Sequence, residues 1–165
     1  MNDAVLQAIN DQIKHEFDAA YAYLQASAYF ESHNLAGFAR WMRAQSQEEV
    51  AHAMKLFDFV LDRGAQVTLQ ALDQPRADFA SPVDAFARAQ EHERVVTTQI
   101  DALYALAVRE KDYRAQVLLQ WFINEQVEEE KNATRIVEEL KMVGDNSSAL
   151  LLLNNELGAR RAGAE

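Results

Sequence analysis

Four long stretches of this sequence place apolar residues at the seven-residue spacing of a buried helix face, and each stretch has one glutamate in that apolar column. The columns are Ile9, Glu16, Tyr23 and Phe30; Met42, Glu49 and Leu56; Phe86, Glu93, Ile100 and Ala107; and Phe122, Glu129, Ile136 and Val143. The chain holds five glycines and two prolines, so few turns can interrupt these helices. The pattern predicts an all-α bundle of four long helices.

The four glutamates are expected to lie at one level of the bundle. Counted from the turns that join the helices at about 1.5 Å per residue, all four fall within roughly one helical turn of the same height. His52 joins them, because the Glu49-x-x-His52 step puts both side chains on one helix face. A buried carboxylate needs a partner or must lose its charge, and the converging columns hold no lysine or arginine. We therefore expect cations at this point.

Caps and breakers set the limits of the expected helices. Asn2 or Asp3 can cap the first helix, and Gly64 in the C′ position ends the second. Ser81 followed by Pro82 can begin the third. The expected long helices cover about 3–32, 35–63, 82–110 and 113–143.

A connection of 18 residues, 64–81, separates the second and third helices. Fully extended it reaches roughly 60 Å, whereas a helix of about 28 residues is about 42 Å long. The connection can therefore run along the bundle and start the third helix parallel to the second, in an up-down-down-up order. We expect one domain over 1–165, with the bundle over 3–143 and a short fifth helix over 147–158.

The fifth helix carries leucines at 150–153, which are apolar on every side of a short helix. An exposed patch of that kind usually marks an interface. We expect this segment to be buried against neighbouring subunits; the alternative is a flap folded onto the chain's own bundle.

Composition and charge exclude several classes of protein. The net charge of −10 argues against nucleic acid or an anionic membrane as the main partner. Without cysteine there is no disulfide framework and no thiolate metal site. The start of the chain lacks the features of a signal peptide, and the longest aliphatic run, 149–153, is too short to span a bilayer. We expect a cytoplasmic protein that attracts cations.

The converging donor set indicates the metal. Four carboxylates and one imidazole fit iron(II) or manganese(II), with zinc as a competitor. The charge of the set suits two divalent ions that share one bridging carboxylate. Each ion of such a pair can give an electron to O₂, which is oxidative chemistry without an organic cofactor.

Along nearly its whole length the chain resembles the bacterial non-haem ferritins, which belong to the ferritin-like di-iron carboxylate bundles. The residues that carry the resemblance are Glu16 with Tyr23, residues 47–52 (QEEVAH), Glu93, and residues 119–131 (LQWFINEQVEEEK). The long crossover and the short fifth helix match as well. The resemblance implies an all-α, ferritin-like four-helix bundle with a short C-terminal helix.

The resemblance also implies three iron positions, named here site A, site B and the third iron site. Site A would use Glu16, Glu49 and His52. Site B would use Glu49, Glu93 and Glu129, with Gln126 nearby. The third iron site, on the cavity side, would use Glu48, Glu125, Glu128 and Glu129. Tyr23 would donate a hydrogen bond or an electron to this centre.

The implied function is iron storage with ferroxidase activity, in which O₂ or peroxide oxidises iron(II) and iron(III) mineral collects inside a hollow shell of twenty-four chains, a homo-oligomer. Asn132 replaces the second histidine of the general di-iron scheme, so an all-oxygen site B should hold iron less tightly and pass it to storage. Val50 stands where haem-binding members carry methionine, so we expect no haem.

Two alternatives remain open. A rubrerythrin-like or mini-ferritin protein would keep the bundle but consume peroxide, and a structural bundle would hold only water between its core acids. Around the expected centre, Glu130 should lie on a solvated helix face and Trp121 in the core. Surface positions are expected for His15, His33 and His92.

Overall fold

The computed structural model describes residues 1–159, and every regular element in that range is a helix. The helices are α1 (Asp3–Ser32), α2 (Ala36–Asp62), α3 (Pro82–Arg109), α4 (Tyr113–Val143) and α5 (Ser147–Leu157). The predicted all-α fold is confirmed, and each helix end lies within one residue of the expected position. None of the helices in the described range is long and apolar enough to cross a membrane.

Local signals set the helix ends. The Asn2 side chain accepts a backbone N–H of the first turn of α1 and caps that helix. Ser81 caps α3 in the same way, with Pro82 in the first turn. Gly64 follows α2 with φ of +68°, a conformation that glycine adopts without steric cost.

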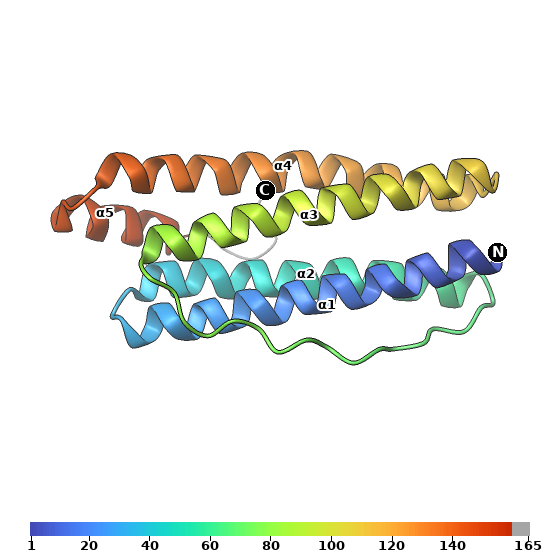
Figure 1. The fold of residues 1–165 in the computed structure, drawn as a ribbon, viewed down its shortest axis with the longest axis horizontal. Helices are drawn as coiled ribbons and strands as arrows, with labels where there is room; N and C mark the ends of the chain where they lie inside the picture. The colour runs from blue at the N-terminus through green and yellow to red at the C-terminus, as the bar shows by residue number, and fades with distance from the viewer. Residues whose placement is uncertain (160–165) are drawn as a thin grey trace.

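The four long helices form two antiparallel pairs, α1 with α2 and α3 with α4 (Figure 1). The crossover between α2 and α3 runs along the bundle, so that α3 begins at the end where α2 also begins. α2 and α3 therefore point in the same direction, and the order is up-down-down-up, as predicted from the reach of the crossover. α5 lies at the end of the bundle where α4 ends.

Hydrogen bonds hold the crossover against α1. The Asn10 side chain accepts the backbone N–H of Thr68 at 2.9 Å, and Asp18 accepts the backbone N–H of Asp73 at 2.9 Å. Lys14 forms ion pairs with both Asp18 and Asp73. These contacts fix the path of a connection that has no helix or strand of its own, and so fix where α3 starts.

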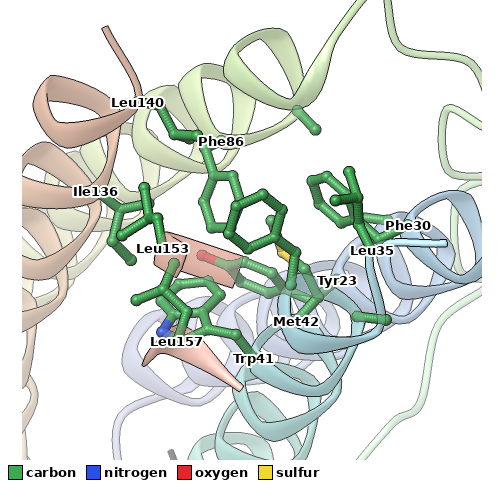
Figure 2. Close-up of a cluster of buried hydrophobic side chains, with 14 of the residues drawn as sticks. Tyr23, Phe30, Leu35, Trp41, Met42, Phe86, Ile136, Leu140, Leu153 and Leu157 are labelled. Carbon is green, nitrogen blue, oxygen red and sulfur yellow. The ribbon is translucent and has the colours of Figure 1, made fainter. Parts of the chain in front are cut away.

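Two apolar clusters fill the bundle, one on each side of a polar level. The cluster near α5 includes Phe30, Met42, Phe86 and Ile136 (Figure 2). The cluster toward the other end includes Ile13, Leu56, Val96 and Phe122. On each long helix, the inward glutamate lies in the sequence between a residue of one cluster and a residue of the other. The apolar clusters therefore enclose the polar level from both ends.

α5 buries part of its apolar surface on the chain's own bundle. Leu153 and Leu157 belong to the cluster near α5 (Figure 2). Leu151 and Leu152 are 53% and 70% exposed. The alternative of a flap on the same bundle thus applies to one side of the helix, and burial of the exposed leucines against other subunits stays a prediction.

Asn154 holds α5 onto the start of α2. Its side chain accepts the backbone N–H of Phe38 at 2.9 Å, at a helix start whose N-cap residue, Leu35, provides no side-chain acceptor. This close approach requires glycine at position 37, because a Cβ on Gly37 would lie 1.7 Å from the backbone oxygen of Asn154. The contact replaces an ordinary helix cap by one supplied from α5.

Replacing Gly37 by alanine should force α5 away from α2. We expect a loss of roughly 2–3 kcal/mol in the free energy of unfolding, the upper part of the range for overpacking, measured as a lower melting temperature. Gly64→Ala is the control, since a Cβ there meets nothing within 4 Å and the positive φ alone costs about 1 kcal/mol. An unchanged melting temperature for Gly37→Ala would show that the α5–α2 contact adds nothing to stability.

Candidate metal centre

Three side chains with metal-ligating atoms meet inside the bundle. Glu16 comes from α1, and Glu49 and His52 come from neighbouring turns of α2. Nδ1 of His52 lies 3.2 Å from Oε2 of Glu49 and 4.0 Å from Oε2 of Glu16. One donor atom from each residue lies within 4.8 Å of the others, and all three side chains are buried. These are the residues predicted for site A.

Glu93 on α3 and Glu129 on α4 add two more buried carboxylates. Glu93 accepts a hydrogen bond from the hydroxyl of Tyr23. Glu129 accepts one at 2.8 Å from the amide of Gln45, which also donates to Glu49 at 3.1 Å. This shared donor places Glu129 beside Glu49. Glu129 is therefore linked to site A through Gln45, and the charges of Glu49 and Glu129 act on Glu93.

The buried carboxylates lose hydration and repel one another. Burial raises the pKa of Glu16 to about 8, and the negative charge of Glu49 adds to the effect. Burial also raises the pKa of Glu93 well above its usual value, with the charges of Glu49 and Glu129 adding to it. No lysine or arginine is among the buried residues of the range 1–159. Near neutral pH the metal-free centre therefore keeps protons that a bound cation would replace.

His52 is the basic group of this acidic centre. Burial lowers the pKa of His52, but its hydrogen bond to Glu49 and the charges of Glu49 and Glu16 raise it to about 9. Burial would raise the pKa of Glu49, yet the hydrogen bond from His52 lowers it below the usual value. The pair therefore shares a proton in the metal-free protein, at the atoms that would bind a metal.

Aromatic rings fix the orientation of the His52 imidazole. The rings of Trp121 and Phe122 stand edge-on to it, with centroid distances of 5.4 and 5.9 Å. Trp121, expected in the core, is half-buried and packs against the apolar cluster toward the other end, with the Lys55 ammonium nitrogen 4.1 Å from its ring centroid. The packing holds Nδ1 of His52 toward the carboxylates.

The donor set fits a divalent cation. Carboxylate oxygens with one imidazole nitrogen are ligands that suit iron(II) and manganese(II), and zinc also accepts them. A cation would supply the positive charge that the buried residues lack. The geometry therefore supports a metal centre at this level of the bundle.

Comparison with known proteins agrees with this geometry. Residues 6–143 match the family model of the ferritin-like domain. The chain belongs to the ferritin family. It is 38% identical over 156 residues to the bacterial non-heme ferritin of Staphylococcus aureus, covering 94% of each chain. It is also 38% identical over 160 residues to the bacterial non-heme ferritin of Bacteroides fragilis, covering 97% of this chain and 99% of the other.

Solved ferritin structures have the same fold. An open-pore ferritin from the hyperthermophilic archaeon Archaeoglobus fulgidus is 45% identical, with a TM-score of 0.97 over 98% of this chain and 99% of the other. A humanized archaeal ferritin is 44% identical, with a TM-score of 0.98 over 99% of both chains. The prediction of a ferritin-like bundle with a short C-terminal helix is confirmed.

The residues predicted for the third iron site lie at the edge of the buried centre of this ferritin. Glu48 and Glu125 are half-buried, and Glu128 is exposed. Glu129 is buried and is the residue that the third iron site would share with site B. Gln126 is buried, and its amide nitrogen donates to Glu93 at 3.3 Å. The third iron site itself stays a prediction.

Three polar residues lie deeper than predicted. Glu130 was expected on a solvated face, but it is half-buried and accepts a hydrogen bond from Thr97 on α3. His15 and His92 are half-buried, with Nδ1 of His15 and Nε2 of His92 shielded from solvent. They were expected at the surface, but α1 and α3 pack against each other. His33 is exposed, as predicted.

Two buried glutamines of the centre were missed in the sequence. Gln12 donates to Glu16 at 2.8 Å, and Gln45 donates to Glu49 and Glu129. Each glutamine precedes a glutamate on its own helix by four residues, which puts the two side chains in contact. That spacing at inward positions is the signal that could have found them, since Gln45 lies in the same column as His52.

Replacing Glu16 by glutamine should stabilise the metal-free protein. The pKa of Glu16 is about 8 in the folded chain against 4.5 ordinarily, so folding requires proton uptake wherever the unfolded side chain is ionised. This penalty is absent below about pH 4.5 and grows as the pH rises toward the folded pKa. The gain from Glu16→Gln should therefore increase between about pH 5 and about pH 8, to roughly 1–3 kcal/mol. Thermal unfolding of metal-free samples across this range measures it.

Glu31→Gln is the matched control for this measurement. Glu31 lies at an exposed position of the same helix, so its replacement should change the free energy of unfolding little at any pH. A stability gain for Glu16→Gln that stays constant or shrinks with rising pH would contradict a protonated Glu16 in the metal-free centre.

Proposed function

We propose that this ferritin stores iron and is a ferroxidase that oxidises iron(II) at sites A and B with O₂ or peroxide. The observation that carries the proposal is the buried group of Glu16, Glu49 and His52. The buried carboxylates of Glu93 and Glu129 beside it extend the donor set toward a second ion. The relatives that are bacterial non-heme ferritins support iron storage.

Iron(II) ions are the substrate, and the chain binds them by exchanging protons for positive charge. At site A, an ion takes the place of the protons that Glu16 and His52 hold in the metal-free centre. Glu49 has Oε2 toward His52 and Oε1 toward the amide of Gln45, which also contacts Glu129. Its two oxygens thus have different partners, one in site A and one shared with Glu129, which suits a carboxylate that bridges sites A and B.

Electrons and protons balance in a two-iron reaction. Two iron(II) ions give up one electron each, and O₂ that accepts these two electrons and two protons leaves as hydrogen peroxide. Where peroxide is the oxidant, it accepts two electrons and two protons and leaves as water. The protein holds both ions near one oxidant molecule, and its carboxylates accommodate the added charge of iron(III).

Residues around the two ions have supporting roles in the proposal. The Tyr23 hydroxyl is buried and donates to Glu93, so it can orient that carboxylate or supply an electron to the centre. Gln126 contacts the same carboxylate. The third iron site would then receive iron on its way to the mineral and would be formed by Glu48, Glu125, Glu128 and Glu129.

The assembly is proposed to be a cytoplasmic shell of twenty-four chains, each a single domain. The exposed leucines of α5, Leu151 and Leu152, provide apolar surface for contacts between subunits. The net charge of −10 would draw cations to the shell.

Aerobic addition of iron(II) to the metal-free assembly tests this function. The wild-type protein should oxidise two iron(II) ions per chain in a fast phase, inside a particle of about 450 kDa for chains of 18.7 kDa. Glu49→Ala and His52→Ala should each reduce the initial rate by about 100-fold or more, because each removes a ligand of the reacting ions. Stopped-flow absorbance and light scattering measure the two quantities.

Glu31→Ala serves as the control, since Glu31 is exposed and far along α1 from the centre. Its fast phase should equal that of the wild type. Slow, unsaturable oxidation by the wild-type protein, at the rate of Glu49→Ala, would rule out the ferroxidase assignment. A dimer or dodecamer that consumes peroxide would rule out the storage shell.

A further inference from the structure

A buried glutamine amide reaches each of the four carboxylates in the centre. The pairs are Gln12 with Glu16 at 2.8 Å, Gln45 with Glu49 at 3.1 Å and with Glu129 at 2.8 Å, and Gln126 with Glu93 at 3.3 Å. All three glutamines are buried. The acidic centre is thus surrounded by neutral hydrogen-bond donors.

On the two carboxylates of site A, the amide holds the oxygen that does not face the histidine. Gln12 donates to Oε1 of Glu16, whereas Oε2 of Glu16 lies 4.0 Å from Nδ1 of His52. Gln45 donates to Oε1 of Glu49, whereas Oε2 of Glu49 lies 3.2 Å from the same nitrogen. The hydrogen bonds therefore restrain the rotation of each carboxylate about its own axis and leave Oε2 of each facing His52 at site A.

Gln45 also links carboxylates on two helices whose backbones lie apart. In the described residues, the backbones of α2 and α4 make no close contact across the bundle. The Gln45 amide on α2 donates to Glu129 on α4. Because the same amide also donates to Glu49, it ties together the two carboxylates that site B requires to be close.

An amide suits this task better than a charged donor. Lysine or arginine would also orient a carboxylate, but its positive charge would compete with the incoming ion and repel it. A neutral amide satisfies one oxygen of the carboxylate and leaves its negative charge for the metal. Partners of this kind keep the ligands in place whether or not an ion is bound.

We propose that Gln12 and Gln45 are positioning residues of the metal centre, with Gln12 orienting Glu16 for site A and Gln45 holding Glu49 and Glu129 together for site B. The proposal rests on the two-ion centre proposed above and names what fixes its geometry.

Zinc, a divalent ion that is not oxidised, tests the two roles separately. Gln12→Met and Gln45→Met keep the size of each side chain but remove its donor. Gln12→Met should weaken zinc binding at site A by about 10- to 100-fold, and Gln45→Met should weaken site B by a similar factor, as expected for partners that orient metal ligands. Calorimetry on the metal-free assembly gives the affinities, and anomalous diffraction gives the zinc occupancy at each site.

Gln116→Met is the matched control, because the half-buried Gln116 amide donates to the backbone oxygen of Ala107, away from the centre. It should leave both sites unchanged. Gln12→Asn and Gln45→Asn keep the amide but shorten its reach, and they should reproduce the site-specific losses if a methionine variant does not assemble. Asparagine variants that assemble and bind zinc with wild-type affinity at both sites would overturn the positioning roles.

The outcomes separate the two levels of the proposal. Wild-type protein that binds no pair of zinc ions overturns the two-ion centre and the positioning roles together. Wild-type protein that binds the pair, with Gln12→Met and Gln45→Met equal to it, overturns the positioning roles alone. Equal weakening of both sites by Gln12→Met also overturns the role of Gln12, because Glu16 belongs to site A alone and a general structural effect would act on both sites.

Discussion

The structure depends on the burial of four carboxylates at one level of an apolar bundle. A carboxylate that leaves water without a partner costs several kcal/mol even after the protein relaxes around it. Here the compensation comes from protons, from glutamine amides and from the Tyr23 hydroxyl. The two apolar clusters on either side supply burial that offsets the rest and exclude water from the level between them.

This arrangement requires four helices to agree in height along the bundle. Short turns set the heights within each antiparallel pair, but the two pairs are joined by a crossover without regular structure. Its hydrogen bonds to α1, from Thr68 to Asn10 and from Asp73 to Asp18, fix where α3 starts. At the other end, α5 caps α2 through Asn154. Contacts far from the centre thus set the geometry of the centre.

The fold could be predicted from the sequence because the seven-residue apolar spacing and the residues that begin and end helices are local signals. The heptad columns gave the buried faces, and residues such as Gly64 and Ser81 gave the ends. The glutamate and histidine ligands could be identified because an acid in an apolar column is unusual. Gln12 and Gln45 were missed, because the same four-residue step from amide to acid also occurs at the surface, where Gln7 donates to Asp11 on α1. Only the step combined with an inward position distinguishes them.

The contact of α5 with α2 and the depth of the polar residues beside the centre could not be predicted from the sequence, because they depend on contacts between helices. The requirement for Gly37 depends on the backbone of Asn154, which lies over a hundred residues later in the chain. The depth of His15 and His92 depends on how α1 and α3 approach each other, and that of Glu130 depends on Thr97 of the neighbouring helix. The residue spacing within one helix does not indicate which of its side chains a neighbouring helix will cover.

Buried acids with a structural role and those of the proposed metal centre have different hydrogen-bond donors in this chain. Asp112 caps α4 and accepts two hydrogen bonds from the Arg63 guanidinium group, at 3.0 and 3.2 Å. Burial would raise the pKa of Asp112, but the Arg63 guanidinium group lowers it below its usual value. The Asp112 carboxylate therefore stays charged and paired with Arg63. Glu16 and Glu49 have amides instead, and their negative charge is balanced in the metal-free centre by protons, on Glu16 itself and on His52. A carboxylate paired with arginine is fixed in one state, whereas one held by glutamine can exchange its cation, as the proposed passage of iron through this centre would require.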